Sequence, residues 1–166
     1  MKILQPDILL HRVTDITPEL LRELQVRGLI LDVDNTLALD KGEAPLPGLE
    51  RWIAEMQAGG VSLTVLSNNS AARVSPFARQ LGLPFISRAA KPLCFGYLRA
   101  ARSLSLPRRQ TAIVGDQIFT DILGGSLAGL RTILVEPIRP ENGWTFRVRR
   151  HFEAGVIDKY RRRCKK

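Results

Sequence analysis

Short runs of hydrophobic residues alternate along this chain with longer stretches in which hydrophobic residues recur every three or four positions. Short apolar runs bounded by turn residues are typical of buried strands, and the longer periodic stretches are typical of helices that bury one face. The pattern predicts five strands, at residues 28–33, 61–66, 84–87, 111–114 and 131–135. It predicts helices between them, at residues 47–58, 70–81, 92–104 and 119–128.

Three prolines refine these helices. Pro18 follows Thr17 and is expected to start a short helix ahead of the first strand. Pro92 is expected at the first position of its helix, where a missing N–H has no partner to lose. Pro76 is expected to break or restart the helix at 70–81, because proline cannot donate the hydrogen bond of a helix interior.

Strands that alternate with helices favour right-handed strand–helix–strand units and a parallel sheet. We therefore predict the α/β class, with three α/β/α layers in a Rossmann-like order around a five-stranded parallel sheet. The 166 residues are close to the length of one domain. We place this domain at residues 1–138, opening with a helical segment at 1–26, and assign residues 139–166 to a basic C-terminal extension.

The chain contains no apolar run as long as the roughly 18 residues of a membrane-spanning helix. Its N-terminus meets Asp7 and His11 too early for a signal peptide. Its two cysteines form no disulfide framework, which suits a reducing compartment. These features favour a cytoplasmic protein.

The positive charge of the chain is unevenly distributed. The formal net charge is +9, yet residues 1–138 hold 15 basic and 13 acidic residues, and residues 139–166 hold 10 and 3. A basic segment suits a polyanionic partner such as nucleic acid, an anionic membrane or a phosphorylated substrate. A solvated tail that only aids solubility is the alternative.

Two carboxylates follow the first predicted strand. Asp32 and Asp34 leave a hydrophobic run two residues apart, which costs desolvation and mutual repulsion unless a cation relieves it. Magnesium is held in proteins by one or two carboxylates together with substrate phosphate. An Asx-rich turn is the purely structural alternative for this segment.

Other polar residues follow the later strands. Ser67 ends the second strand, Asp116 ends the fourth with Asp121 five residues later, and Lys91 precedes a predicted helix. Each alone is explained as a helix cap or a surface residue. Ligands of parallel sheets bind beyond the carboxyl ends of the strands, so that together these residues predict a site for phosphate and Mg²⁺.

The chain resembles the haloacid dehalogenase (HAD) superfamily of phosphatases over roughly residues 27–136. Within it, the chain is similar to the YqeG-like group of IIIA-type phosphatases, which is related to phosphatidylglycerophosphate phosphatases. The resemblance rests on four motifs: Asp32-Val33-Asp34-Asn35-Thr36, Ser67 with Asn68-Asn69, Lys91-Pro92, and Gly115-Asp116 with Asp121.

The resemblance implies catalytic roles for three residues. Asp32 would be the nucleophile that forms an aspartyl-phosphate, and Asp34 would protonate the leaving alcohol and then activate water. Lys91 would neutralise the charge of the nucleophile and the phosphate.

The resemblance also implies the binding residues. Mg²⁺ would be held by Asp32, Asp34 through its backbone carbonyl, and Asp116. Ser67 and the backbone N–H of Asn68 would bind the phosphoryl oxygens. In supporting roles, Asp121 would fix Lys91 or a metal-bound water, and Thr36 would shape the loop.

The spacing between motifs leaves no room for the cap domain that many superfamily members carry. Leu37 to Leu46 is only ten residues, and three residues separate Ser87 from Lys91. An open, capless site suits a phosphate on a large object. We therefore expect a Mg²⁺-dependent phosphomonoester hydrolase acting on a lipid phosphate such as phosphatidylglycerophosphate.

A lipid substrate would give the basic extension a partner, the anionic membrane that contains the substrate. We expect residues 144–166 to dock the protein on an anionic membrane, as a peripheral protein at its inner face. Two alternatives stay open: a phosphatase for a nucleotide, sugar or protein phosphate, and a non-catalytic RNA- or membrane-binding module. Nucleic acid is the less favoured partner because the sequence contains no RNA-binding motif.

Overall fold

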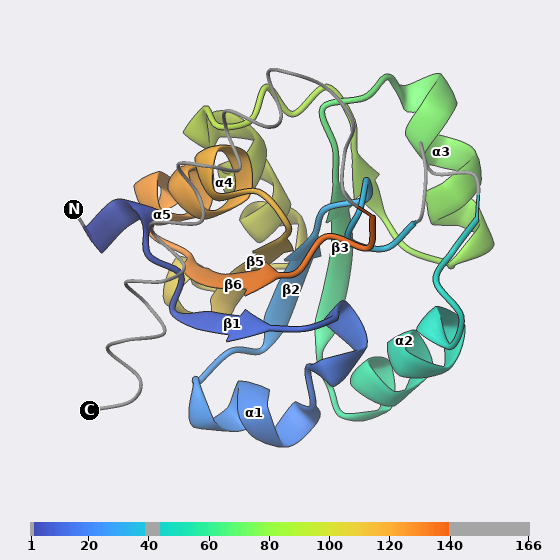
Figure 1. Ribbon diagram of the computed structural model, residues 1–166, viewed down its shortest axis with the longest axis horizontal. Coiled ribbons are helices and arrows are strands. Elements are labelled where there is room, and N and C mark those ends of the chain that lie inside the picture. The colour runs from blue at the N-terminus through green and yellow to red at the C-terminus, as the bar shows by residue number, and fades with distance from the viewer. Residues whose placement is uncertain (1, 39–43, 140–166) are drawn as a thin grey trace.

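A computed structural model describes residues 2–38 and 44–139 (Figure 1). The proposed membrane segment, residues 144–166, lies outside the described residues, as does nearly all of the basic extension. None of the helices in the described part has both the length and the apolar character that crossing a bilayer needs.

The fold is built on one parallel sheet in the order β1-β6-β5-β2-β3-β4. The five predicted strands are present as β2 (Gly28–Leu31), β3 (Ser62–Leu66), β4 (Phe85–Ile86), β5 (Thr111–Gly115) and β6 (Arg131–Val135). The prediction of five strands is nevertheless wrong by one, because β1 (Ile8–Leu10) adds a sixth.

The additional strand comes from the segment predicted to be only helical. Ile8–Leu10 pairs with β6 in parallel, with Ile8 opposite Ile133. Asp7 fastens the start of this pairing, since its N–H donates to the Thr132 carbonyl at 3.0 Å and its carboxylate accepts from the Thr132 N–H at 2.8 Å. Residues 1–26 therefore contribute an edge of the sheet.

Helices cover both faces of the sheet, as the predicted three layers require (Figure 1). Alternate residues of each strand point to opposite faces, so Leu29 and Leu31 enter one core cluster and Ile30 enters another. The first cluster packs under α1 (Pro18–Glu23), α2 (Leu49–Ala58) and α3 (Ala71–Gln80). The second packs under α4 (Cys94–Ser103) and α5 (Leu123–Ala128).

Two of the three proline predictions are wrong. Pro76 lies inside an unbroken α3. It and Ala72, whose carbonyl would accept its missing bond, both lie on the exposed side of the helix, where water can solvate that carbonyl. Pro92 precedes α4 rather than starting it, because a turn closed by the Leu93 N–H and the Ala90 carbonyl at 2.9 Å comes first.

The helix predicted at 119–128 has two parts. It begins as a π-helix, η4 (Ile118–Ile122), and continues as α5. Single π-turns are rare and often occur at functional sites. The described residues also contain three short 3₁₀ helices: η1 (Lys2–Leu4), η2 (Val13–Asp15) and η3 (Arg108–Gln110).

Candidate functional site

The predicted site residues meet at one edge of the sheet. β5, β2 and β3 are adjacent, and all run in the same direction. Asp116, Asp32 and Ser67 each follow one of these strands directly, and all three are buried. The parallel topology therefore gathers at the carboxyl edge residues that are far apart in the sequence.

A tight loop shapes the segment after β2. The Asp32 N–H continues the sheet by donating to the Val114 carbonyl at 2.9 Å. The Val33 carbonyl then accepts from the N–H groups of Leu37 and Ala38 at 3.0 and 3.1 Å. Asn35 takes a left-handed conformation with φ of 59°, which asparagine tolerates better than most residues. The backbone thus turns back at once and leaves Asp32 at the strand end.

Lys91 joins two of the carboxylates. Its Nζ donates to Asp32 Oδ1 at 2.5 Å and to Asp121 Oδ1 at 2.7 Å, and its side chain is only 5% exposed. Asn68 holds the backbone at Lys91, because its Oδ1 accepts from the Lys91 N–H at 2.7 Å and its Nδ2 donates to the Lys91 carbonyl at 3.3 Å. The Asn68 side chain therefore positions Lys91, which the sequence reasoning did not foresee.

The π-helix η4 places Asp121. The Asp121 N–H donates to the Gln117 carbonyl at 2.9 Å, and the Asp121 carboxylate accepts from the Gln117 N–H at 3.2 Å. Tyr97 braces this turn from α4 by donating its hydroxyl to the Thr120 carbonyl at 2.7 Å. Gly115 permits the close approach, since a Cβ there would collide with the Asp121 carboxyl.

Three buried carboxylates form a cluster that could hold a cation. Asp32, Asp116 and Asp121 offer oxygens that all lie within 4.8 Å of one another. If all three are ionised, Lys91 neutralises one charge and leaves two negative charges, which match one divalent cation. Carboxylate oxygens suit Mg²⁺, and so the residues present fit the predicted ion.

The electrostatics of the cluster reflect its burial. Burial raises the pKa of Asp32 to about 7, since the loss of solvation and the neighbouring Asp121 outweigh the Lys91 charge. Burial lowers the pKa of Lys91, but the Asp121 and Asp32 carboxylates raise it further, so that it stays above its ordinary value. Lys91 therefore stays protonated, and its single positive charge cannot balance all three neighbouring carboxylates when they are ionised.

Asp34 has its own partners outside this cluster. Its Oδ2 accepts from Asn69 Nδ2 at 2.7 Å, and its Oδ1 lies 3.6 Å from Arg73 Nη2. Asn69 follows Ser67 on the β3–α3 loop, and Arg73 is in the first turn of α3. Sequence reasoning missed the contact of both residues with Asp34, although the polar Asn68-Asn69 pair directly after a site residue was a signal.

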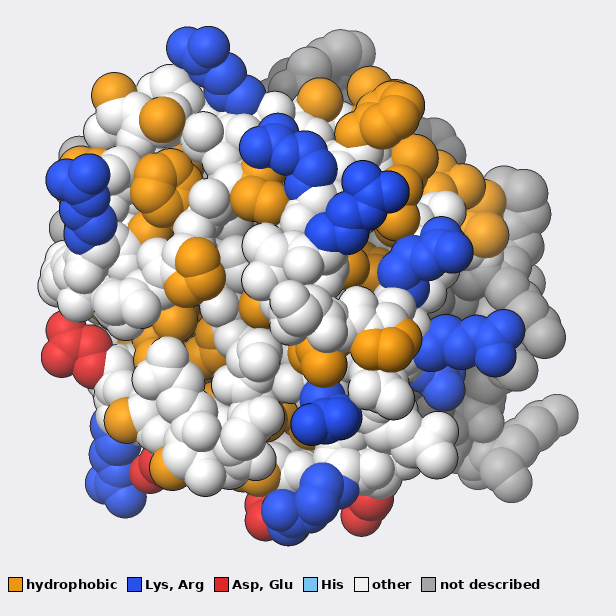
Figure 2. All heavy atoms as spheres, turned by 180° about the vertical axis from the view of Figure 1, so that it is seen from behind, with side chains coloured by type: hydrophobic (Ala, Val, Ile, Leu, Met, Phe, Trp, Pro, Cys, Tyr) orange, Lys and Arg blue, Asp and Glu red, His pale blue; other side chains and the backbone are white. Residues whose placement is uncertain are grey.

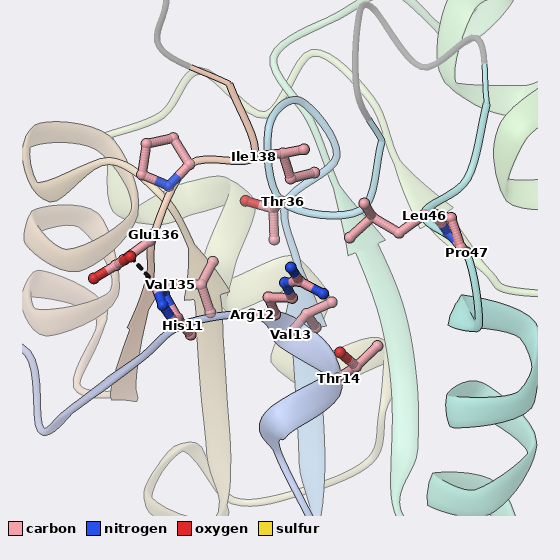
Figure 3. Close-up of a pocket in the computed structure, with 11 residues that line it drawn as sticks. His11, Arg12, Val13, Thr14, Thr36, Leu46, Pro47, Val135, Glu136 and Ile138 are labelled. Carbon is pink, nitrogen blue, oxygen red and sulfur yellow. Dashed lines mark ion pairs between the residues drawn. The ribbon is translucent and has the colours of Figure 1, made fainter.

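Ser67 and Thr36 are both buried beside these groups. Ser67 Oγ accepts from the Asn69 N–H at 3.2 Å and so shapes the start of the β3–α3 loop. Thr36 Oγ1 has no hydrogen-bond partner among the described residues. Thr36 also borders a separate cavity of about 490 Å³ between η2, the loop before α2 and the end of β6 (Figure 3).

That cavity is distinct from the carboxylate cluster. Its walls are mixed: apolar residues such as Val13, Leu46 and Val135 alternate with polar and charged ones, and His11 and Glu136 pair there with 2.5 Å between Nδ1 and Oε2 (Figure 3). None of the three clustered carboxylates lines it. The residues that could hold a metal ion therefore lie outside this cavity.

Comparison with protein families and curated proteins gives consistent matches. Residues 88–137 match the model of the HAD-hydrolase-like family. The chain is 38% identical over 162 residues to a Bacillus subtilis protein named probable phosphatase YqeG, covering 98% of this chain and 94% of that protein.

A second relative and a solved structure match over a smaller share of this chain. The chain is 30% identical over 121 residues to chloroplastic phosphatidylglycerophosphate phosphatase 1 of Chlamydomonas reinhardtii, covering 68% of this chain but only 45% of that protein. A 4-nitrophenylphosphatase from Thermotoga maritima shares the fold at 13% identity, with a TM-score of 0.58 over 74% of this chain and 89% of that chain.

Proposed function

The chain belongs to the HAD superfamily, in the YqeG-like group of IIIA-type phosphatases, and on that premise we propose that it hydrolyses phosphomonoesters through an aspartyl-phosphate on Asp32. The observation that carries the proposal is the buried contact of Asp32 with Lys91 at the carboxyl edge of the sheet. A carboxylate nucleophile divides one difficult displacement into two easier ones.

In the first step an Asp32 carboxylate oxygen attacks phosphorus, and the bond from phosphorus to the alcohol oxygen breaks. Asp34 donates its proton to that leaving oxygen. In the second step water attacks the aspartyl-phosphate and gives its proton to Asp34. Inorganic phosphate leaves, and Asp32 and Asp34 return to their starting forms.

The remaining residues bind and orient the phosphoryl group. Ser67 and the backbone N–H of Asn68 hold its oxygens. Lys91 offsets the repulsion between the anionic nucleophile and the anionic substrate. Thr36 shapes the loop. Asp121 keeps the Lys91 ammonium aimed at Asp32, which is supported by its 2.7 Å contact.

Asp32, Asp116 and the Asp34 backbone carbonyl would hold Mg²⁺. When bound, the ion shields phosphate charge during the displacement. The balance of three buried carboxylates against one ammonium supports this assignment.

We infer a lipid phosphate, with phosphatidylglycerophosphate as the first candidate substrate. The name of the algal relative supports this class, and so do the short connections between motifs, which leave an open site for a headgroup on a large assembly. The basic residues 144–166 would add affinity for an anionic membrane.

We expect phosphate release from phosphatidylglycerophosphate to require Mg²⁺ and to exceed release from nucleotide, sugar and phosphopeptide substrates. EDTA should reduce the rate to background. Replacing Asp116 by Asn should raise the Mg²⁺ concentration for half-maximal rate by roughly tenfold or more, because one charged ligand is lost. Mg²⁺ should raise the melting temperature of the wild type more than that of the variant.

The readouts separate the parts of this proposal. Full activity in EDTA would exclude the metal assignment. Preference for a soluble phosphate ester would exclude the lipid substrate but support the proposed reaction. Absence of hydrolysis on the whole panel would favour a binding module.

Asn69→Ala should lower kcat by roughly tenfold with little change in KM. The variant removes the 2.7 Å hydrogen bond that orients Asp34 but leaves the groups that bind phosphate. The loss should be largest for substrates with poor leaving groups, because these depend most on the acid. Ser75→Ala on α3 is the matched control and should keep the wild-type rate. An equal loss for good and poor leaving groups would contradict a positioning role toward Asp34.

A further inference from the structure

One part of the domain contains only positive charge. Residues 56–115 contain eight Lys and Arg and no Asp or Glu, whereas residues 1–55 and 116–138 together contain seven basic and thirteen acidic residues. Six of the eight lie on α3, on α4 or on the loop between β4 and α4, and these two helices contact β4, whereas Arg108 and Arg109 lie on η3, ahead of the central strand β5. Folding therefore brings six of these cations to the elements around β4, although the domain as a whole is nearly neutral.

The surface opposite to that seen in Figure 1 carries many more basic than acidic side chains (Figure 2). Lys and Arg side chains spread over it with apolar side chains between them, and acidic side chains lie at its lower and left margins (Figure 2). A surface with this mixture differs from an ordinary solvated face, where both signs of charge are interspersed.

Two large apolar side chains stand exposed next to the catalytic lysine. Leu93 is 57% exposed and Phe95 is 69% exposed, two and four positions after Lys91. The turn that carries them is tied to the site through the two hydrogen bonds between Asn68 and the Lys91 backbone. Four residues of chain reach at most about 14 Å, so the backbone of both residues lies within that distance of the Lys91 backbone.

Arginines continue the surface along α4. Phe95, Arg99 and Arg102 are spaced by four and three residues, which places them in one row on the helix, and all three are exposed. Arg88 is exposed on the loop before Lys91. The apolar residues thus lie at the end of the row that is nearest Lys91, and along the chain Arg88 precedes them and Arg99 and Arg102 follow them.

We infer that Leu93, Phe95, Arg88, Arg99 and Arg102 form a docking face for an anionic lipid bilayer, an inference that rests on the proposed lipid substrate. Leu93 and Phe95 insert among the acyl chains and headgroups, and the arginines pair with lipid phosphates. Docking in this orientation brings the turn of Lys91 to the headgroup layer. A lipid phosphate then reaches Asp32 without leaving the membrane.

The same cations could attract RNA, but the apolar residues favour a bilayer. Binding of single-stranded RNA uses several aromatic side chains on which successive bases stack. Within residues 56–115, Phe95 is the one large aromatic side chain that is exposed, and its exposed apolar neighbour is aliphatic. An aliphatic and an aromatic residue among arginines match the interface of a membrane instead.

The test compares full-length wild type with Leu93→Ser/Phe95→Ser in sedimentation with phosphatidylcholine vesicles that contain phosphatidylglycerol. We expect the partition coefficient of the variant to fall by roughly tenfold or more, because both inserting side chains are lost. Leu127→Ser is the matched control. Leu127 is 58% exposed, but it lies in the last turn of α5, toward the amino ends of the strands and away from the site, and its replacement should leave vesicle binding unchanged.

Activity on two substrates separates docking from catalysis. The double variant should hydrolyse water-soluble 4-nitrophenyl phosphate at the wild-type rate, which also shows that it is folded. It should be slower than wild type on phosphatidylglycerophosphate in vesicles and equal to it on the same lipid in detergent micelles. If the double variant loses vesicle binding but the wild type hydrolyses no lipid, the docking face is supported and the proposed substrate is excluded.

Two results would overturn the inference. One is a double variant that binds anionic vesicles as tightly as wild type and Leu127→Ser. The other is wild-type protein that ignores these vesicles and binds single-stranded RNA, with the binding weakened by Arg99→Gln/Arg102→Gln.

Discussion

Asp32→Asn should reduce phosphate release by roughly 10⁴-fold or more, because an amide cannot form the acyl-phosphate bond. The fold should survive. Asparagine has the same shape as aspartate, and Lys91 keeps Asp121 as a buried partner. Removing one charge from a cluster with excess negative charge should also leave the free energy of unfolding within about 1 kcal/mol of wild type, or raise it.

Steady-state rates, urea unfolding and intact-mass analysis of the stopped reaction provide the measurement. The wild type should show a transient phosphoryl adduct that Asp32→Asn lacks. Glu50→Gln, an exposed carboxylate-to-amide change on α2, is the control and should keep the wild-type rate. A fully active Asp32→Asn would place the nucleophile elsewhere, and an unfolded one would make Asp32 a structural residue.

Lys91→Met should abolish activity and also destabilise the protein by about 3–5 kcal/mol near pH 8. Methionine fills the space of the lysine stem but leaves the buried Asp32 and Asp121 carboxylates without their shared cation. The cost of an uncompensated buried charge exceeds that of most single substitutions. Urea unfolding in EDTA measures it without a contribution from metal.

The pH dependence of this loss identifies its cause. The pKa of Asp32 is raised in the folded protein from 3.8 to about 7, so the folded state binds more protons than the unfolded chain within that window. The free energy of unfolding therefore falls as the pH rises through the window, and the loss of Lys91 should widen it. Lys91→Met should thus be less destabilised near pH 5 than near pH 8.

A surface cation provides the comparison for this variant. Arg51→Met removes an exposed pair with Glu55 on α2 and should change the free energy of unfolding by under about 0.5 kcal/mol at either pH. Equal destabilisation of Lys91→Met at both pH values would mean that lost packing, rather than unpaired charge, is the cause.

Much of the site could be read from the order of residues along the chain. Asp32, Ser67 and Asp116 each follow an apolar run, and parallel strands bring such ends together. The contacts that orient the side chains could not be read in this way. Asn68 holds the Lys91 backbone and Asn69 holds Asp34, across separations of 23 and 35 residues, and no local pattern carries such pairings.

The elements whose signals are local can be predicted from the amino-acid order. Hydrophobic periodicity identifies β2, β3, β5 and β6, because a buried strand needs apolar residues wherever it pairs. The position of β1 depends on tertiary contacts, since three residues form a strand there through pairing with β6 more than a hundred residues away. The π-turn of η4 and the continuity of α3 through Pro76 were likewise visible only in the folded protein.

The same division holds for charge. The sequence determined that the excess of basic residues lies in residues 139–166, and that residues 1–138 are nearly neutral. Folding places six cations of the stretch 56–115 on α3, α4 and the loop between β4 and α4, and the carboxylates Asp32, Asp116 and Asp121 in one buried cluster. Electrostatic interactions depend on distance and burial in space, and neither is a property of position along the chain.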